Sequence, residues 1–508
     1  MRDRLLLVID AGSTKVKCLV FDATGKLKSC SLKDYVYQNR TDDSSLIREF
    51  DCALLWKNIC EGIQSALYSA DARAEEIAGI SATSQRGGVV FLDKAGKELY
   101  AGPNTDLRAI AEGLALDARY RRKIHNITGH LPSLMFVPAR LLWFKNNDLG
   151  LFEKINTVLT ISDWIIFRLT GNRCGEICSA IETGLADVRN RSVSEEILAL
   201  AGLPSNLYPE IRPAGSLAGE VQRSVAEDLG LPAGIPVIQG APDTICGLLG
   251  LGLSENGQTG IISGWSTPVD MIIEKPVFDP ECRIWTGCHL FEGKWILESN
   301  CGETGNSMNW LRELYFGDGG KDKGNGFDYL DAISAKVSPG AEGVMAFVGA
   351  EAMDMSRLEI RWGGFILPIP FSATNIRRNH LARATLENVA FAVKANCQQL
   401  EETAGVEMTS IAMGGGLVRC NCLKQILPAV LNRPIQFSKL AETSGSGAAM
   451  LAATGAGLYS NLFEAMTCMK AVTEIVEPAP VLANEYGELY EKWLSTFHKL
   501  KMIGRDLN

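Results

Sequence analysis

Long apolar runs and an excess of positive charge are both missing from this sequence of 508 residues. No stretch of 18 or more apolar residues occurs, and the apolar run at 5–9 is too short for a signal peptide. The 50 Lys and Arg residues are outnumbered by 59 Asp and Glu residues, which gives a formal net charge of −9. A negative net field disfavours nucleic acid and anionic membranes as partners. We therefore expect a cytoplasmic protein with no nucleic-acid or membrane partner.

Histidine is scarce, and cysteine follows no metal-binding or disulfide pattern. The five histidines are not paired at ligand spacing, so a zinc site is not expected. The 14 cysteines are too few for a disulfide scaffold in a chain of this length, and we expect them to be reduced thiols. The sequence also lacks G-x-x-x-x-G-K-[ST], G-x-G-x-x-G in its strand–turn–helix setting, and G-x-S-x-G. A P-loop ATPase and a simple dehydrogenase are therefore disfavoured.

The residues that are present alternate between strand-like and helical patterns, which predicts an α/β fold. Apolar runs at 5–9 and 15–21 flank a Gly-Ser-Thr turn, and a weak copy of this unit recurs over 260–273. Helices are predicted around 55–67, 386–400 and 486–500, and an exposed loop is predicted at 316–326. Length alone predicts more than two but fewer than five compact units, at roughly 100–200 residues each. The repeated unit indicates two related halves with a boundary near 245–257.

Three glycine-rich turns follow apolar strands: Gly12-Ser13-Thr14, Gly264-Trp265-Ser266-Thr267 and Gly414-Gly415-Gly416. Backbone N–H groups at glycine can approach phosphate oxygens closely, and neighbouring hydroxyls add donors. One such turn by itself is best interpreted as a tight turn of a large α/β protein. Three turns, two of them in a repeated frame, favour a site for nucleotide phosphates.

Charged side chains near these turns match the needs of phosphoryl transfer. Asp10, at the end of the first strand, can hold Mg²⁺ through water as the ion bridges phosphates, or can simply form the turn. Lys15 and Lys17 offer positive charge to a phosphate, although lysines near a hairpin are usually solvated. Asp243, expected in a loop between the halves, is a candidate base for the proton of an attacking hydroxyl.

Two other loops carry candidates for binding a hydroxyl-rich acceptor. Gln85, Arg86, Asp106 and Arg108 together provide the donors and acceptors that vicinal hydroxyls require. The simpler interpretation of these residues is ordinary surface-loop chemistry.

The order of these motifs resembles the FGGY family of carbohydrate kinases nearly from end to end. The stretch 10–17 is similar to the family's Asp-x-Gly-Thr-Thr-x-x-Arg, with Lys17 in place of arginine. The stretch 240–252 resembles its Gly-x-x-Asp…Leu-Gly-x-Gly, whose aspartate is the family's catalytic base. The other matching stretches are 85–86, 104–108, 161–171, 305–310, 414–416 and 442–449.

The resemblance implies an α/β fold of two actin-like (ribonuclease-H-like) domains with an interdomain catalytic cleft. The N-terminal domain, 1–248, would hold the acceptor side and first phosphate loop, and the C-terminal domain, 249–508, the nucleotide side and a closing helix. The implied activity is an ATP- and Mg²⁺-dependent kinase that transfers the γ-phosphoryl group to a hydroxyl of a small sugar, ketose or polyol. A xylulose-like pentulose is favoured as acceptor, and the autoinducer dihydroxypentanedione is the alternative. A homodimer is left open.

The same resemblance gives each candidate residue a role. Asp243 is the catalytic base, and it contacts the substrate together with Gln85, Arg86 and Asp106. Asp10 binds the metal. The residues implied to bind the nucleotide are Gly12, Ser13, Thr14, Lys17, Gly264, Ser266, Gly305, Asn309, Gly415 and Gly416.

Some positions depart from the family pattern. Trp265 stands where a threonine is common, and Arg86-Gly87 matches neither the Met-His of xylulose kinases nor the Arg-Glu of glycerol kinases. The Arg86-Gly87 pair therefore gives weak support to either of these two substrates. Trp265 and Lys17 keep open a sugar sensor that has lost turnover. The same scaffold would also suit an actin-like ATPase that acts on protein partners. Neither would release ADP in response to a polyol.

Overall fold

The computed structural model describes residues 4–34, 37–38, 46–316, 326–357, 359 and 361–507. It forms two compact units, fewer than the length alone suggests. Unit 1 consists of Met1–Ser254, Glu274–Ile296 and Thr443–Ala471, and unit 2 consists of Glu255–Ile273, Leu297–Glu442 and Val472–Asn508. Each unit is thus built from three segments of the chain. The limits 1–248 and 249–508 were expected for the two domains implied by the family resemblance, which differ from these contact-based units. They stay a prediction.

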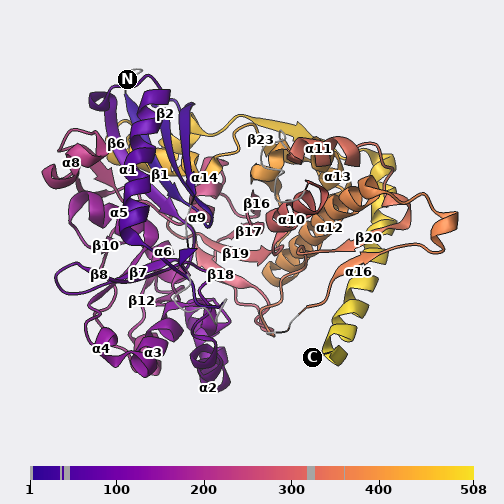
Figure 1. The fold of residues 1–508 in the computed structure, drawn as a ribbon, viewed down its shortest axis with the longest axis horizontal. Helices are drawn as coiled ribbons and strands as arrows, with labels where there is room; N and C mark the ends of the chain where they lie inside the picture. Colours follow the sequence, from indigo (N-terminus) through magenta and orange to yellow (C-terminus); the bar gives the residue numbers. More distant parts are fainter. Residues whose placement is uncertain are drawn as a thin grey trace. The chain divides into compact units, whose positions relative to one another are not determined.

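The central sheet of unit 1 runs in the order β14 (Leu217–Glu220), β15 (Pro236–Ile238), β6 (Ile77–Ser84), β1 (Leu5–Ala11), β2 (Lys15–Asp22) and β3 (Leu27–Asp34). β1 and β2 form the predicted hairpin, with Asp10 opposite Lys17. β6 runs parallel to β1 (Figure 1), and β15 runs parallel to β6. The carboxyl ends of β1, β6 and β15 therefore lie at one edge of the sheet, where α/β proteins place their ligands.

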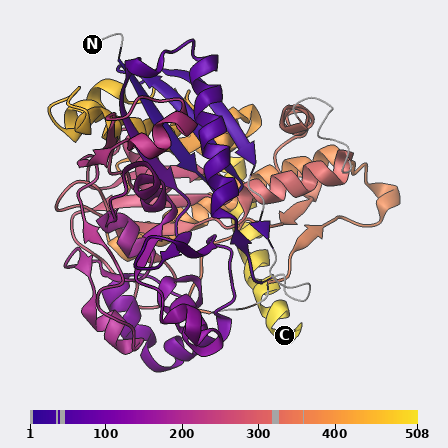
Figure 2. The ribbon, with the colours of Figure 1, turned by 60° about the vertical axis from the view of Figure 1, so that its left-hand side comes forward.

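Two helices cover opposite faces of this sheet. α1 (Cys52–Ser69) covers one face (Figure 2). The side chains of a strand alternate between faces, and Ile9 of β1 belongs to the same buried cluster as Ile59 of α1. On the other face, Leu19 contacts α14 (Thr443–Gly455) at Gly445. Contacts of α14 with β1, β6 and α9 (Asp243–Gly250) explain why the segment containing α14 belongs to unit 1.

Within unit 2 the sheet runs in the order β19 (Trp295–Asn300), β17 (Pro268–Ile273), β16 (Gln258–Ser263), β22 (Ser410–Gly415), β23 (Ile435–Ser438) and β24 (Thr473–Val476). β16 and β17 are an antiparallel hairpin, and β22 runs parallel to β16 with Gly415 opposite Ser263. Unit 2 therefore repeats an arrangement seen in unit 1, namely an antiparallel hairpin whose first strand also pairs with a parallel strand. This confirms the predicted relation between the two halves.

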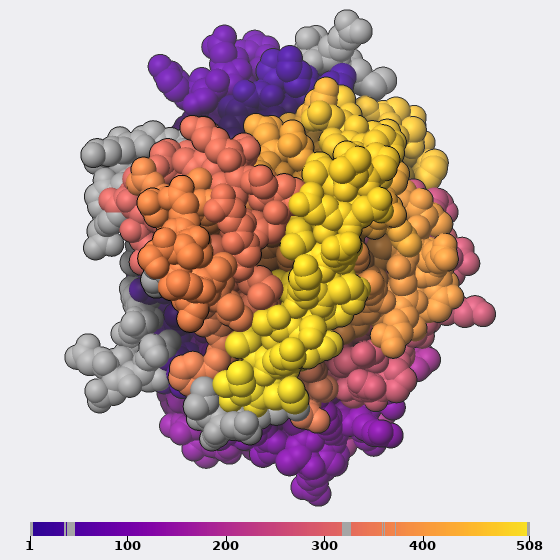
Figure 3. All heavy atoms as spheres, turned by 90° about the vertical axis from the view of Figure 1, so that its right-hand side faces the viewer, coloured from indigo at the N-terminus to yellow at the C-terminus, as the bar shows by residue number. Residues whose placement is uncertain are grey.

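Long helices pack beside this second sheet. The predicted helices at 386–400 and 486–500 lie within α12 (Arg378–Ala404) and α16 (Pro480–Leu507). α16 forms a continuous ridge on one face of unit 2 (Figure 3). Trp493 of α16 is buried and donates from its indole nitrogen to Asn388 Oδ1 of α12, at 2.9 Å.

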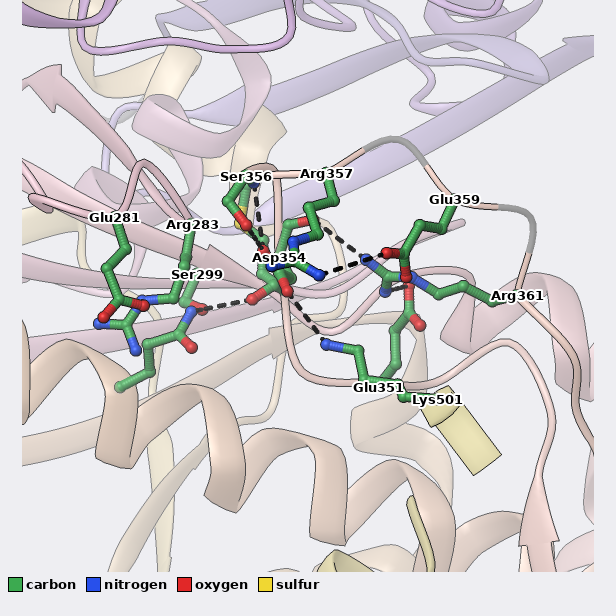
Figure 4. A network of polar contacts seen from close by, with 12 residues as sticks. Glu281, Arg283, Ser299, Glu351, Asp354, Ser356, Arg357, Glu359, Arg361 and Lys501 are labelled. Atoms are coloured by element: carbon green, nitrogen blue, oxygen red, sulfur yellow. Dashed lines mark hydrogen bonds and ion pairs between the residues drawn. The ribbon is translucent and has the colours of Figure 1, made fainter. Parts of the chain in front are cut away.

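Near its carboxyl-terminal end, α16 takes part in a charged network (Figure 4). Lys501 Nζ lies 3.1 Å from Asp354 Oδ2, and Arg361 pairs with Glu351 and donates to the Asp354 carbonyl at 3.1 Å. Lys501, Arg361 and Glu351 line a cavity of about 350 Å³ together with Trp362. Ion pairs that water can reach, as these partly exposed ones can be, contribute at most about 1 kcal/mol each. The buried aromatic side chains of α16 therefore contribute most of its attachment.

One local expectation changes, and another lies mostly outside the described residues. Asp243 does not lie in a loop, because it is the first residue of α9, directly after Pro242. Residues 317–325 of the expected loop lie outside the described residues, and Phe316 ends α10 (Thr304–Phe316). In the part of the chain that is described, none of the helices has the length and hydrophobicity needed to cross a bilayer.

Candidate active site

Three candidate residues of unit 1 lie at the carboxyl edge of its sheet. Asp10 is near the end of β1, Arg86 follows β6, and Asp243 follows β15. The loop before Asp243 is fastened to β6, because Thr83 Oγ1 donates to the Ala241 carbonyl at 2.8 Å. Parallel pairing of β6 and β15 thus brings Arg86 and Asp243 together from positions far apart in the sequence.

Only glycine fits at position 240 in this loop. A Cβ atom placed there would lie 1.7 Å from the carbonyl oxygen of Ala82. The close approach of the two backbones fixes the start of α9 and therefore the position of Asp243. Helix N-termini favour negative charge, so the start of α9 is a suitable place for a carboxylate.

The carboxyl group of Asp243 has an unusual pKa. Its pKa is raised from 3.8 to about 6, mainly by burial and to a smaller extent by the negative charge of Glu182, against the opposing effects of Arg86 and the Thr244 amide. The Thr244 N–H donates to Asp243 Oδ1 at 2.8 Å. A carboxyl group with a pKa about one unit below neutral is mostly ionised at pH 7, and is a stronger base than an ordinary aspartate.

Residues that sequence reasoning missed surround Arg86. Its Nη1 lies 3.4 Å from Glu182 Oε2, and its guanidinium lies over the Trp285 ring, 5.8 Å from the centroid. His130 Nε2 lies 3.7 Å from the same Glu182 oxygen. The one available sequence signal was Glu182 itself, an acid at the end of the apolar helix α6 (Ile177–Glu182).

The first glycine-rich turn lies beside Asp10. Gly12 and Ser13 are half-buried and Thr14 is exposed, so their backbone N–H groups lie near the surface of unit 1. Asp10 is 6% exposed, and its Oδ2 lies 3.7 Å from Lys17 Nζ. The turn therefore combines a carboxylate, an ammonium group and backbone donors, which suits a phosphate with an associated cation.

Gln85 and Asp106 occupy more interior positions than the other candidates. Gln85 is 2% exposed and donates to the Gly12 carbonyl at 3.3 Å, so it connects the β6 edge to the first turn. Asp106 is fully buried, and it accepts from Arg108 Nε at 2.7 Å and from the Tyr100 hydroxyl. These contacts hold loops in place, and direct contact of either residue with an acceptor stays a prediction.

In unit 2, the second glycine-rich turn contacts the start of α10. Gly264 and Trp265 are exposed, and Gly305 N–H donates to the Trp265 carbonyl at 3.1 Å. A Cβ atom at Gly305 would lie 2.0 Å from the Gly264 carbonyl oxygen, so glycine is needed there. Ser266 is half-buried in the same turn. Asn309 lies about one turn further along α10, and it is also half-buried.

The third glycine-rich turn follows the neighbouring strand β22. Gly415 has φ +91°, and Ser263 Oγ donates to the Gly414 carbonyl at 2.8 Å. Gly416 is exposed, and a Cβ atom there would meet nothing within 4 Å. The open space at Gly416 and the exposed backbone at Gly264 suit an approaching nucleotide.

Comparisons with known proteins identify the family to which the chain belongs. The model of the FGGY family of carbohydrate kinases, N-terminal domain, matches residues 5–250, and the model of its C-terminal domain matches 261–456. The chain belongs to this family. An autoinducer-2 kinase from Salmonella paratyphi B is 30% identical, over 98% of this chain and 95% of the relative.

Solved structures extend the likeness to the whole fold. The xylulose kinase from Rhodospirillum rubrum is 26% identical, with a TM-score of 0.83 over 99% of this chain and all of that one. The gluconate kinase from Lactobacillus acidophilus is 21% identical with a TM-score of 0.85 over 99% of this chain and 100% of that chain, a likeness of fold alone. The protein is thus an FGGY sugar kinase with two actin-like domains.

The residues present fit the phosphate donor of this family. FGGY kinases use ATP, and glycine leaves room for its phosphates at the exposed positions Gly264 and Gly416. Within the described ranges, no group of three or more His, Cys, Asp or Glu side chains is arranged to hold a metal ion. A magnesium ion brought in with ATP needs only one or two carboxylates besides phosphates and water, and Asp10 fits that role.

Proposed function

We propose that this kinase phosphorylates a hydroxyl group of dihydroxypentanedione, a small uncharged ketone. Curated relatives with 28–30% identity over nearly the whole chain are autoinducer-2 kinases. The observation that carries the chemistry is Asp243, a half-buried carboxyl group with a raised pKa, beside Arg86 and at the same sheet edge as the first phosphate turn.

A xylulose-like pentulose is the second candidate acceptor. The likeness to the Rhodospirillum rubrum xylulose kinase extends over both full chains at 26% identity. Both candidates are short, uncharged and rich in hydroxyl groups, so the same pocket chemistry serves either.

The proposed mechanism assigns each step to residues of this chain. Asp243 accepts the proton of the acceptor hydroxyl while the hydroxyl oxygen attacks the γ-phosphorus, and the bond to ADP breaks. In unit 1, Gly12 offers the phosphates a backbone donor and Lys17 a positive charge, and in unit 2 Gly264 and Gly415 are the proposed nucleotide-binding glycines. Asp10 would hold Mg²⁺, which neutralises the charge of the phosphates when bound.

The deciding experiment measures ADP release by purified protein with Mg-ATP and a panel of sugars, polyols and dihydroxypentanedione. Strong stimulation by one compound supports the kinase and identifies the acceptor. Stimulation by xylulose alone would select the second candidate. ADP release that no compound changes would contradict the proposal and favour an ATPase acting on protein partners.

The acid limb of the pH profile should report the ionisation of Asp243. Only the ionised carboxylate accepts a proton, and its pKa is about 6. We expect kcat/KM for the acceptor to rise about tenfold per pH unit below pH 6 and to level off above it. Arg86→Gln should move this limb to higher pH, because it removes a positive charge that lowers the pKa. An unchanged limb in this variant would contradict the assignment.

The proposed setting is the cytoplasm, with small molecules rather than nucleic acid or membranes as partners. The net charge of −9 supports this choice, because it disfavours polyanionic surfaces. Light scattering of the purified kinase would decide between a monomer and the homodimer that the sequence leaves open.

A further inference from the structure

The helix α5 (Ile161–Thr170) packs against β6 and β15, the two strands that lead to Arg86 and to the proposed base. Its first turn forms a hydrogen bond with the end of each strand. Ser162 N–H donates to Oγ of the last residue of β6 at 3.0 Å. Asp163 Oδ1 accepts from Nε2 of Gln239, the residue after β15, at 2.8 Å. The start of α5 therefore fastens both strand ends to one helix.

The carboxyl group of Asp163 is enclosed by protein. Asp163 is 0% exposed, and its Oδ2 accepts from Thr160 Oγ1 at 2.7 Å and from the Tyr208 hydroxyl at 3.4 Å. Burial raises its pKa from 3.8 to about 7, against the hydrogen bonds from Thr160 and Gln239. When Oδ2 carries a proton, that proton faces hydroxyl groups that can also accept, and Oδ1 still accepts from Gln239. The bond to Gln239 is therefore present whether or not Asp163 is ionised.

Both polar atoms of the Gln239 side chain are bonded inside unit 1. Gln239 is 0% exposed, and while its Nε2 donates to Asp163, its Oε1 accepts from Cys174 Sγ at 3.2 Å. A buried amide nitrogen that loses its acceptor is strongly unfavourable. Removal of the Asp163 carboxyl group should therefore force Gln239 to rearrange.

The segment from Gln239 to Asp243 has little freedom to absorb such a rearrangement. Only three residues separate the two, and Asp243 begins α9. Within this segment Gly240 has no room for a Cβ atom, and the Ala241 carbonyl accepts from Thr83 Oγ1 at 2.8 Å. A displacement that begins at Gln239 is therefore passed on to the carboxyl group of Asp243.

We propose that Asp163 is a positioning residue of the kinase reaction, and that it acts through Gln239 to hold the Asp243 carboxyl group against the acceptor hydroxyl. The inference rests on the proposed function, since it takes Asp243 as the base. Asp163 contacts no reacting atom in this role. Its effect on the rate comes from geometry, because a misplacement of about 1 Å can cost roughly a hundredfold.

Asp163→Ala should lower kcat for the acceptor at least about tenfold, because it removes the bond that holds Gln239. KM for ATP should stay close to the wild-type value, since Asp163 bonds to none of the glycine-rich turns. Asp163→Asn should retain most of the turnover, because its Oδ1 can accept from Gln239 while its amide nitrogen donates to Thr160 Oγ1. Steady-state ADP release with Mg-ATP and either dihydroxypentanedione or D-xylulose measures these rates.

A double substitution distinguishes positioning from general damage to the fold. If Asp163 acts through the position of Asp243, Asp163→Ala should cost almost nothing further once Asp243→Asn has removed the base. Independent damage would multiply instead. A double variant that loses the full factor a second time would overturn the inference.

Two more variants complete the comparison. Gln239→Met removes the same hydrogen bond from its other side with little change in side-chain length, and it takes the place of Asp163→Ala if that variant does not fold. Asp51→Ala removes the carboxylate that caps α1 of the same unit, so it should lower thermal stability and keep wild-type kcat.

These rates separate failure of the inference from failure of the proposed function. Absence of acceptor-dependent ADP release in wild type, or wild-type turnover in Asp243→Asn, would overturn both. Low turnover in Asp243→Asn together with wild-type kcat in Asp163→Ala or Gln239→Met would overturn the inference alone. A loss of kcat in Asp51→Ala as large as that in Asp163→Ala would do the same.

Discussion

Asp243→Asn is expected to lower acceptor-dependent turnover at least about a hundredfold, the size of effect associated with loss of a general base. Asparagine has nearly the same shape, and its carbonyl oxygen can still accept from the Thr244 N–H, so α9 should begin as before. An amide does not take up a proton near neutral pH. Steady-state ADP release with saturating acceptor measures the loss.

The same variant should bind ATP nearly as well as wild type, which calorimetry can check. Asp228→Asn is a matched control, because Asp228 is an exposed aspartate on α8 (Arg223–Leu229) of the same unit. It should retain wild-type turnover. A near wild-type rate for Asp243→Asn would exclude Asp243 as the base, and loss of ATP binding would show that the substitution acts on the structure instead.

Much of the fold was predictable because its signals are local. The β1–β2 hairpin and its repeat in β16–β17 follow from apolar runs that flank a glycine turn, and α1, α12 and α16 follow from apolar spacing. The start of α9 was missed, because the Gly-Ala-Pro segment before Asp243 is equally typical of a loop.

The surroundings of Asp243 could not be predicted in the same way. Glu182 meets Arg86 across 96 positions of sequence, and Trp285 lies farther still along the chain. No periodicity encodes such a contact, because it depends on how helices and strands of unit 1 pack. The burial of Asp106 could not be predicted for the same reason, because it depends on packing against its partner Tyr100 of the strand β8 (Glu98–Gly102).

Gly415→Ala should strongly destabilise unit 2. Gly415 has φ +91° and ψ −168°, a backbone conformation that essentially only glycine adopts. An added Cβ atom would also lie 2.0 Å from the Ser263 carbonyl oxygen, which belongs to backbone that cannot rotate away. We expect a loss of at least about 3 kcal/mol in the free energy of unfolding, from strain and overpacking together.

Gly416, the residue after Gly415, provides a closely matched control. Gly416→Ala adds the same methyl group one residue later, where nothing lies within 4 Å. Denaturant unfolding should therefore leave Gly416→Ala within about 1 kcal/mol of wild type, whereas Gly415→Ala should unfold at much lower denaturant. Gly415, at the end of β22, pairs with Ser263 at the end of β16, beside the two glycine-rich turns proposed to bind the nucleotide. Its replacement should therefore also weaken ATP binding in any protein that still folds. Equal stability of the two variants would mean that β16 and β22 do not approach each other as closely at this turn.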